Sequence, residues 1–293
     1  MALRPPLAYN AEVERPPQLK TILANGLELA LWDWPGEAPA LLFAHATGFH
    51  GRCWDRIAGM FPGQRRLSVD FRGHGRSAKP EPPYHWDAFG CDLAAVAREL
   101  DLTDAIGVGH SMGGHSVVLA ACLRPKTFRA LLLIDPTIFP PDYYSAPALD
   151  AGVIRRRRNH WKSPGEMFER FRQRPPFALW KPEILRDYCE FGLLPQDGGY
   201  VLACPPAVEA SIYEHSNAPE ANLYPAIPSL HLPVVVMRAG IEWKRDSFDL
   251  ASSPTAPDLA AKFRNGREVL LKNHDHFIPM ASPDAVAEQL SAF

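Results

Sequence analysis

Short apolar runs alternate with helix-like patterns along most of the chain. Each run is brief and bounded by turn residues, as expected for strands that are buried on both faces of a sheet. The runs span residues 40–44, 66–71, 104–109, 129–135, 233–237 and 267–271, and a hairpin of 20–24 with 27–34 precedes them. Helical patterns fill the gaps at residues 86–100, 112–123, 256–263 and 283–293. This order predicts the α/β class, with a mostly parallel central sheet and helices on both faces.

The rhythm changes between residues 136 and 229, where strong strand patterns give way to helix-like pieces rich in aromatic residues. The aromatic residues are Trp161, Phe168, Phe171, Phe177, Trp180, Tyr188 and Phe191. A stretch of this length is long for a connection within one domain. We therefore expect residues 1–135 and 230–293 to form one core, interrupted by an inserted helical cap at 136–229.

Charge and cysteine content indicate which partners the protein can bind and in which compartment it is expected. The 31 basic and 33 acidic residues leave a net charge of −2, which provides no field for nucleic acid or an anionic membrane. The longest apolar run, residues 117–123, is too short to span a membrane. Five scattered cysteines and an N-terminus without the apolar run of a signal peptide lead us to expect a cytoplasmic protein. The sequence defines no oligomeric state.

A candidate nucleophile lies in the motif G-H-S-M-G at residues 109–113. An apolar strand pattern leads into the motif, and a helical pattern leaves it. A turn this sharp has no room for side chains at the two flanking glycines, and it projects the hydroxyl of Ser111 above the sheet. The start of the following helix offers free N–H groups to a developing oxyanion.

These features resemble the α/β-hydrolase family, and three more motifs agree with it in the family's order. Residues 45–49 (H-A-T-G-F) are similar to its oxyanion loop, and residues 70–77 (D-F-R-G-H-G-R-S) to the loop after its fourth strand. Residues 273–279 (N-H-D-H-F-I-P) are similar to the segment that carries its catalytic histidine. Ala46 and Asp275 stand where the family commonly has glycine. The resemblance implies a serine hydrolase.

A serine hydroxyl needs a general base within hydrogen-bond reach. The resemblance assigns this role to His276 and leaves His274 as a neighbour. The two histidines also form an H-x-H pair, but no third ligand lies at metal-like spacing, so we expect no metal.

The acid that orients the base has three candidates. In the family it usually follows the strand after the insertion, where Trp243 occupies the expected position and Glu242 and Asp246 lie nearby. In some subfamilies the acid ends the preceding strand, and Asp135 lies there, 24 residues after Ser111. We favour Asp135, because the end of a buried strand holds a side chain more accurately than a loop does.

The resemblance also implies an oxyanion hole of two backbone amides. Met112, the residue after the nucleophile, supplies one, and Thr47 supplies the other. The resemblance implies no cofactor.

Four consecutive arginines, residues 155–158, interrupt the 136–229 segment. A charge run of this kind is usually a solvated face, and we interpret it so. The alternative is that one of them binds a substrate carboxylate.

The predicted function is hydrolysis of a small carboxylic ester or lactone through an acyl-serine intermediate. A C–C bond hydrolase and an amidase are alternatives on the same residues. A member that only binds a small ligand is the alternative from another class. Epoxide hydrolases and haloalkane dehalogenases need a carboxylate nucleophile, which Ser111 is not.

Overall fold

The computed structural model describes residues 16–241 and 249–293. Glu242 and Asp246, two of the three candidate acids, lie outside the described residues. The largest feature is an eight-stranded sheet with the strand order β1-β2-β4-β3-β5-β6-β10-β11. The strands are β1 (Gln18–Ala24), β2 (Leu27–Trp34), β3 (Glu37–Ala44), β4 (Gln64–Val69), β5 (Ala105–His110), β6 (Phe128–Ile134), β10 (Val234–Ala239) and β11 (Gly266–Leu271).

The sheet is mostly parallel, as the sequence predicts. β1 pairs with β2, and β2 with β4, in antiparallel fashion. The remaining neighbours are parallel. The carboxyl ends of the parallel strands therefore meet along one edge, where loops carry residues that are far apart in the sequence.

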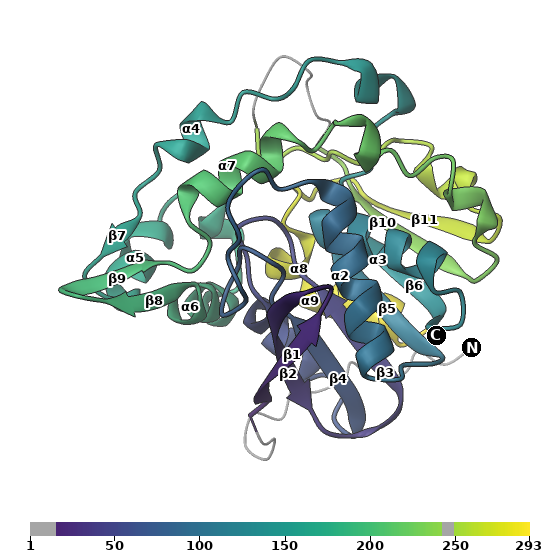
Figure 1. Ribbon diagram of the computed structural model, residues 1–293, viewed down its shortest axis with the longest axis horizontal. Helices are drawn as coiled ribbons and strands as arrows, with labels where there is room; N and C mark the ends of the chain where they lie inside the picture. The colour runs from purple at the N-terminus through teal and green to yellow at the C-terminus, as the bar shows by residue number, and fades with distance from the viewer. Residues whose placement is uncertain (1–15, 242–248) are drawn as a thin grey trace.

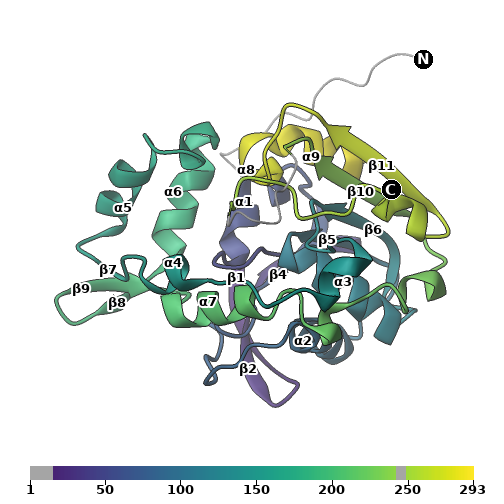
Figure 2. The ribbon, with the colours of Figure 1, turned by 90° about the horizontal axis from the view of Figure 1, so that it is seen from above.

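Helices cover both faces of the sheet. Figure 2 shows α2 (Trp86–Glu99) and α3 (Met112–Leu123) on one side, and α1 (Asp55–Ala58), α8 (Ile278–Ala281) and α9 (Pro283–Leu290) on the other. The strand β6 explains why both faces need cover. Leu131 and Leu133 belong to the core under α2 and α3, whereas Leu132 and Ile134 belong to the core under α1 and α9. Alternating side chains of one apolar strand thus fill two cores.

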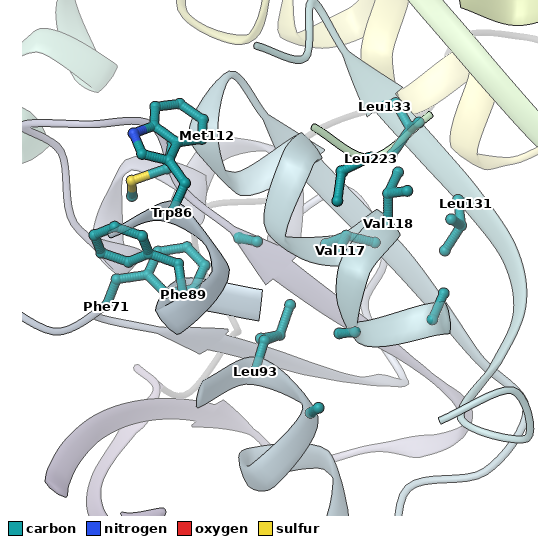
Figure 3. Packing of buried hydrophobic residues seen from close by; sticks show 14 of the residues in the cluster. Phe71, Trp86, Phe89, Leu93, Met112, Val117, Val118, Leu131, Leu133 and Leu223 are labelled. Atoms are coloured by element: carbon teal, nitrogen blue, oxygen red, sulfur yellow. The ribbon is translucent and has the colours of Figure 1, made fainter. Parts of the chain in front are cut away.

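Phe71, Phe89 and Leu93 are completely buried in the first of these cores (Figure 3). They pack with residues of α3, so the helix that follows the G-H-S-M-G turn is fixed against the sheet. The turn therefore starts and ends in rigid structure.

The 136–229 segment connects β6 to β10, which are neighbours in the sheet. It contains α4 (Gly152–Arg155), α5 (Pro164–Phe171), α6 (Pro182–Phe191) and α7 (Pro206–Glu214). The 3-10 turns of the chain are η1 (Gly51–Trp54), η2 (Pro141–Ser145), η3 (Phe177–Leu179), η4 (Pro219–Ala221), η5 (Ile227–Ser229) and η6 (Leu259–Lys262). In Figure 1, α5, α6 and α7 lie outside the main sheet, on its left and above it.

The 136–229 segment contains short strands besides the helices that the sequence predicts. It holds a three-stranded antiparallel sheet of β7 (His160–Trp161), β9 (Gly199–Leu202) and β8 (Leu193–Gln196). The hairpin between β8 and β9 turns at Asp197-Gly198, and Gly198 has a φ of 78°. An Asp-Gly pair is a known hairpin signal, so the sequence carried a cue that the strands' shortness concealed.

The helix predicted over 256–263 is only the short 3-10 turn η6. Pro254 and Pro257 restrict the backbone at its start, which prevents a longer helix from forming there. Within residues 16–241 and 249–293, no helix has the length and apolar character required to cross a bilayer.

Candidate active site

Ser111 occupies a strained turn between β5 and α3. Its backbone has φ 56° and ψ −120°, a conformation that non-glycine residues rarely adopt. Two glycines make the turn possible. A Cβ on Gly109 would lie 2.4 Å from the Gly113 carbonyl oxygen, and one on Gly113 would lie 2.1 Å from that of Ala44. The G-x-S-x-G pattern is therefore a steric requirement of this turn.

A chain of hydrogen bonds joins Ser111 to two residues from distant parts of the sequence. The Oγ of Ser111 lies 2.9 Å from Nε2 of His276, and Nδ1 of His276 lies 2.7 Å from Oδ2 of Asp135. A carboxylate only accepts, so the Nδ1–H donates to Asp135 and Nε2 is left to accept the hydroxyl proton of Ser111. The structure thus brings together the three residues that the sequence singled out.

Asp135 is held rigidly at the end of β6. Its carboxylate is fully buried. While Oδ2 faces His276, Oδ1 accepts from the Ala239 amide at 2.9 Å, the Ser253 hydroxyl at 2.6 Å and the Thr255 hydroxyl at 3.2 Å. Several hydrogen-bond donors around one buried carboxylate stabilise its ionised form.

The imidazole of His276 is held through its own backbone. Its amide donates to the Ala251 carbonyl at 2.8 Å, and its carbonyl lies 2.8 Å from Nε2 of His110. Burial lowers the pKa of His110 well below its usual value, so this ring stays neutral and donates its Nε2–H to that carbonyl. His110 therefore braces the loop that carries His276.

Thr137 is a second hydroxyl at the nucleophile. Its Oγ1 lies 3.0 Å from the Ser111 Oγ, and its amide donates to the Ser111 carbonyl at 3.1 Å. Because the Ser111 proton points to His276, Thr137 is the donor of the hydroxyl pair. Sequence reasoning missed Thr137 and also Ser253 and Thr255, since no spacing rule links them to the motifs.

The two predicted oxyanion amides lie beside the nucleophile. Met112 is the first residue of α3, so its N–H has no acceptor within the helix. The Thr47 amide donates no hydrogen bond within the described part of the chain. The Thr47 hydroxyl donates to the Met112 sulfur at 3.4 Å, which ties the two segments together. The Met112 side chain is buried with Trp86 in the core of Figure 3.

A cavity of about 380 Å³ opens onto Ser111 and His276. Two sides form most of it. The strand-end side consists of the lining residues from loops that follow sheet strands, namely Ala46, Thr47, Gly48, Phe49, Ser111, Thr137, His276 and Phe277. The segment side consists of Leu149, Val153, Ile154, Arg157, Arg158, Trp161, Arg170, Phe171, Arg174, Phe177, Tyr188, Glu209, Tyr213 and Ser216. A cavity of this volume has room for a small molecule.

The interpretation of residues 155–158 as a solvated face is wrong for Arg157. Arg155 pairs with Glu214 on the surface, and Arg158 is exposed at the edge of the cavity, where its guanidinium pairs with Glu166. Arg157 instead lines the cavity and pairs with the buried Glu209. The helix α4 ends at Arg155, so Arg157 is no longer bound to the surface of that helix.

Burial by itself would lower the pKa of Arg157. The Glu209 carboxylate outweighs this effect and raises the pKa above its usual value. Arg157 therefore carries its charge inside the protein, and Glu209 neutralises it.

His274, the neighbour of His276, has a separate partner. Its Nε2 lies 2.7 Å from the Ser282 hydroxyl. The described residues contain no group of three histidine, cysteine, aspartate or glutamate side chains placed to hold a metal ion.

A mostly parallel eight-stranded sheet, with helices on both faces and a strained serine turn after β5, is the α/β-hydrolase fold. The family model described as "Alpha/beta hydrolase family" matches residues 41–289, and the chain belongs to that family.

Two relatives cover different shares of the chain. A 2-(acetamidomethylene)succinate hydrolase of Mesorhizobium japonicum is 29% identical over 268 residues, which are 88% of each chain. An esterase of Mycobacterium tuberculosis is 34% identical over 137 residues, 45% of each. Among solved structures, an E-2-(acetamidomethylene)succinate hydrolase superposes with a TM-score of 0.77 at 24% identity, covering 94% of this chain and 98% of the other.

Proposed function

We propose that the protein hydrolyses a carboxylic ester or lactone of a small molecule through an acyl-serine intermediate. The Ser111 Oγ attacks the carbonyl carbon while its proton moves to Nε2 of His276. The leaving alcohol takes that proton, and water then releases the acyl group by the same route in reverse. Asp135 stabilises the imidazolium, and the amides of Thr47 and Met112 hold the oxyanion.

The observation that carries this proposal is the hydrogen-bonded chain from Ser111 through His276 to Asp135, at the wall of a cavity. A structural role alone would not require a serine in a strained backbone conformation. Nor would it place the neutral nitrogen of an imidazole, fixed by a buried carboxylate, against a hydroxyl.

We further propose that the 136–229 segment is a cap over the site. The segment leaves the sheet after β6 and returns at the neighbouring strand β10, so the core is continuous without it. It also contributes all the residues of the segment side of the cavity.

All five cysteines are free thiols, which is compatible with a reducing cytoplasm.

An amide is the second candidate substrate. The relative that covers 88% of the chain is named a 2-(acetamidomethylene)succinate hydrolase, and that name describes an acetamido compound. The same residues serve an amide, provided that His276 protonates the departing nitrogen.

A panel of methyl esters, five- and six-membered lactones and N-substituted acetamides, followed by pH-stat, tests the proposal. We expect turnover of at least one ester or lactone by the wild-type protein and none by Ser111→Ala. Turnover of amides alone would move the function to the second candidate. Equal turnover by both proteins would remove Ser111 from the reaction.

A further inference from the structure

We infer that the substrate carries a carboxylate away from its scissile bond, and that Arg170 and Arg174 bind this carboxylate at the segment side of the cavity. The inference rests on the proposed function and specifies its substrate class. It follows from the charges that line the cavity.

The described lining residues contain an excess of positive charge. Four arginines, Arg157, Arg158, Arg170 and Arg174, face the cavity, whereas its acidic residues are Glu209 and Asp249. His276 contributes no charge in the state that accepts a proton. A neutral substrate would leave this excess uncompensated.

Two of the arginines are already neutralised. Arg157 pairs with Glu209 and also hydrogen bonds to the side chain of Tyr188. Arg158 pairs with Glu166 at 2.8 Å, and its guanidinium lies over the Trp161 ring. These two are committed to holding the segment together.

Arg170 and Arg174 differ, because neither forms an ion pair within residues 16–241 and 249–293. Their neighbour Arg172 differs from them in both its position and its partner. It lies between them in sequence, is absent from the cavity wall, and pairs with Glu169 at 2.6 Å. Thus, of Arg170, Arg172 and Arg174, the two that face the cavity are those without a carboxylate partner among the described residues.

The acidic residue Asp249 does not fill this role. Its Oδ1 accepts from the Ala251 amide at 2.9 Å, which belongs to a local turn. No ion pair joins Asp249 to a described basic residue.

The surroundings favour a carboxylate over a solvated counter-ion. Phe171 and Phe177 stack with ring centroids 4.4 Å apart, and both line the cavity beside these arginines. Apolar walls lower the local dielectric and strengthen an ion pair with a bound ligand. A guanidinium also matches a carboxylate with two parallel hydrogen bonds.

Matched esters test this inference. Monomethyl succinate, glutarate and adipate are compared with methyl butyrate, valerate and hexanoate, in which a methyl group replaces the carboxylate. We expect kcat/KM to be about tenfold higher for the best acidic ester than for its neutral counterpart. The advantage should shrink with added salt, because the arginines are exposed.

The variant for this test is Arg170→Gln/Arg174→Gln, and Arg172→Gln is the matched control. The double variant should lose the tenfold advantage through a higher KM, with kcat/KM for the neutral esters unchanged. Arg172→Gln should change neither. Equal preference for both ester series, or an equal loss on both in the double variant, would overturn the inference while leaving the proposed function intact.

A binding measurement separates this inference from hydrolysis itself. Titration calorimetry with free glutarate and adipate should detect binding to wild type and to Ser111→Ala, and about tenfold weaker binding to the double variant. If no ester is turned over but the dicarboxylate binds in this pattern, the proposed chemistry fails and the carboxylate site stands. Undiminished binding by the double variant would contradict the site.

Discussion

The two sides of the cavity are built in different ways. On the strand-end side, Ser111, Asp135 and His276 are each less than a tenth exposed, and hydrogen bonds from the sheet and its loops fix them. On the segment side, aromatic rings and arginines dominate, and Arg158, Arg170 and Arg174 are exposed. The comparison supports a division of labour in the proposed function: the rigid sheet would position the reacting groups, and the 136–229 segment would select the substrate.

A buried ion pair of the segment side, Arg157 with Glu209, lies against the strand-end side at Gly48. Arg157 follows α4, Glu209 lies in α7, and a Cβ placed on Gly48 would lie only 2.7 Å from the Glu209 Oε1. Gly48 follows Thr47, the proposed oxyanion residue, and its amide donates to Nε2 of His74 at 3.0 Å. The loop that carries Thr47 and Gly48 is thus packed between the core and the segment.

The largest effect should come from the nucleophile itself. Ser111→Ala should keep the fold, since a smaller residue fits the turn, and should reduce kcat by about 10⁶-fold. Steady-state kinetics on the best ester, with circular dichroism as the folding control, measures this. Retention of more than about a tenth of the activity would contradict the assigned chemistry.

Replacing Asp135, the proposed acid, should cause the second-largest loss of kcat. Asp135→Asn keeps the shape of the side chain but presents an amide to Nδ1 of His276 and favours the wrong imidazole tautomer. We expect kcat to fall by about 10⁴-fold. Glu242→Gln is the comparison variant, because Glu242 is an alternative acid in the sequence, and it should stay within about tenfold of wild type. The opposite ranking would move the acid to Glu242, and two mild variants would point to Asp246.

The buried ion pair of the segment side should matter for stability. Glu209→Gln leaves Arg157 charged and largely buried without its partner, so the free energy of unfolding should fall by about 3 kcal/mol. Glu214→Gln removes the surface partner of Arg155 and should cost less than about 1 kcal/mol. Urea unfolding of both variants compares them. Equal losses would mean that the buried Arg157–Glu209 pair contributes no more to stability than the surface pair does.

Buried histidines should make the stability of the protein sensitive to acid. Burial lowers the pKa of His45, His50 and His115 to about 4 in the folded protein, below the 6.5 of an unperturbed histidine. The unfolded chain therefore binds protons that the folded chain does not. The stability that these histidines contribute is present above pH 6.5 and is lost as the pH falls toward 4.

His115→Gln isolates one of these histidines. Between pH 6.5 and 4, the variant should lose about 1.4 kcal/mol less stability per pH unit than wild type does. Unfolding curves at several pH values measure the two slopes. An unchanged slope would show that His115 does not titrate with unfolding.

The sequence predicted what depends on local patterns. The strands follow from short apolar runs, and the Ser111 turn follows from its glycines, because both are decided by residues within a few positions of each other. Asp135 could be favoured because it ends a predicted strand. The three candidate acids could be separated no further, since the choice depends on where His276 returns in space.

What the sequence did not reveal depends on distant contacts. Ser253 reaches Asp135 across 118 positions, and Thr137 reaches Ser111 across 26. Arg157 faces the cavity because α4 ends two residues before it and because its partner Glu209 lies in α7. No periodicity in a single sequence encodes these contacts between distant residues, since they depend on how the loops pack around the sheet.

Labelling with a fluorophosphonate tests the central claim most directly, because the probe requires an activated serine hydroxyl and needs no knowledge of the substrate. Intact-mass spectrometry followed by peptide mapping should find one adduct, on the peptide that contains Ser111. The adduct should be absent from Ser111→Ala and form far more slowly in Asp135→Asn. No adduct on the wild-type protein, or one on a different residue, would contradict the account.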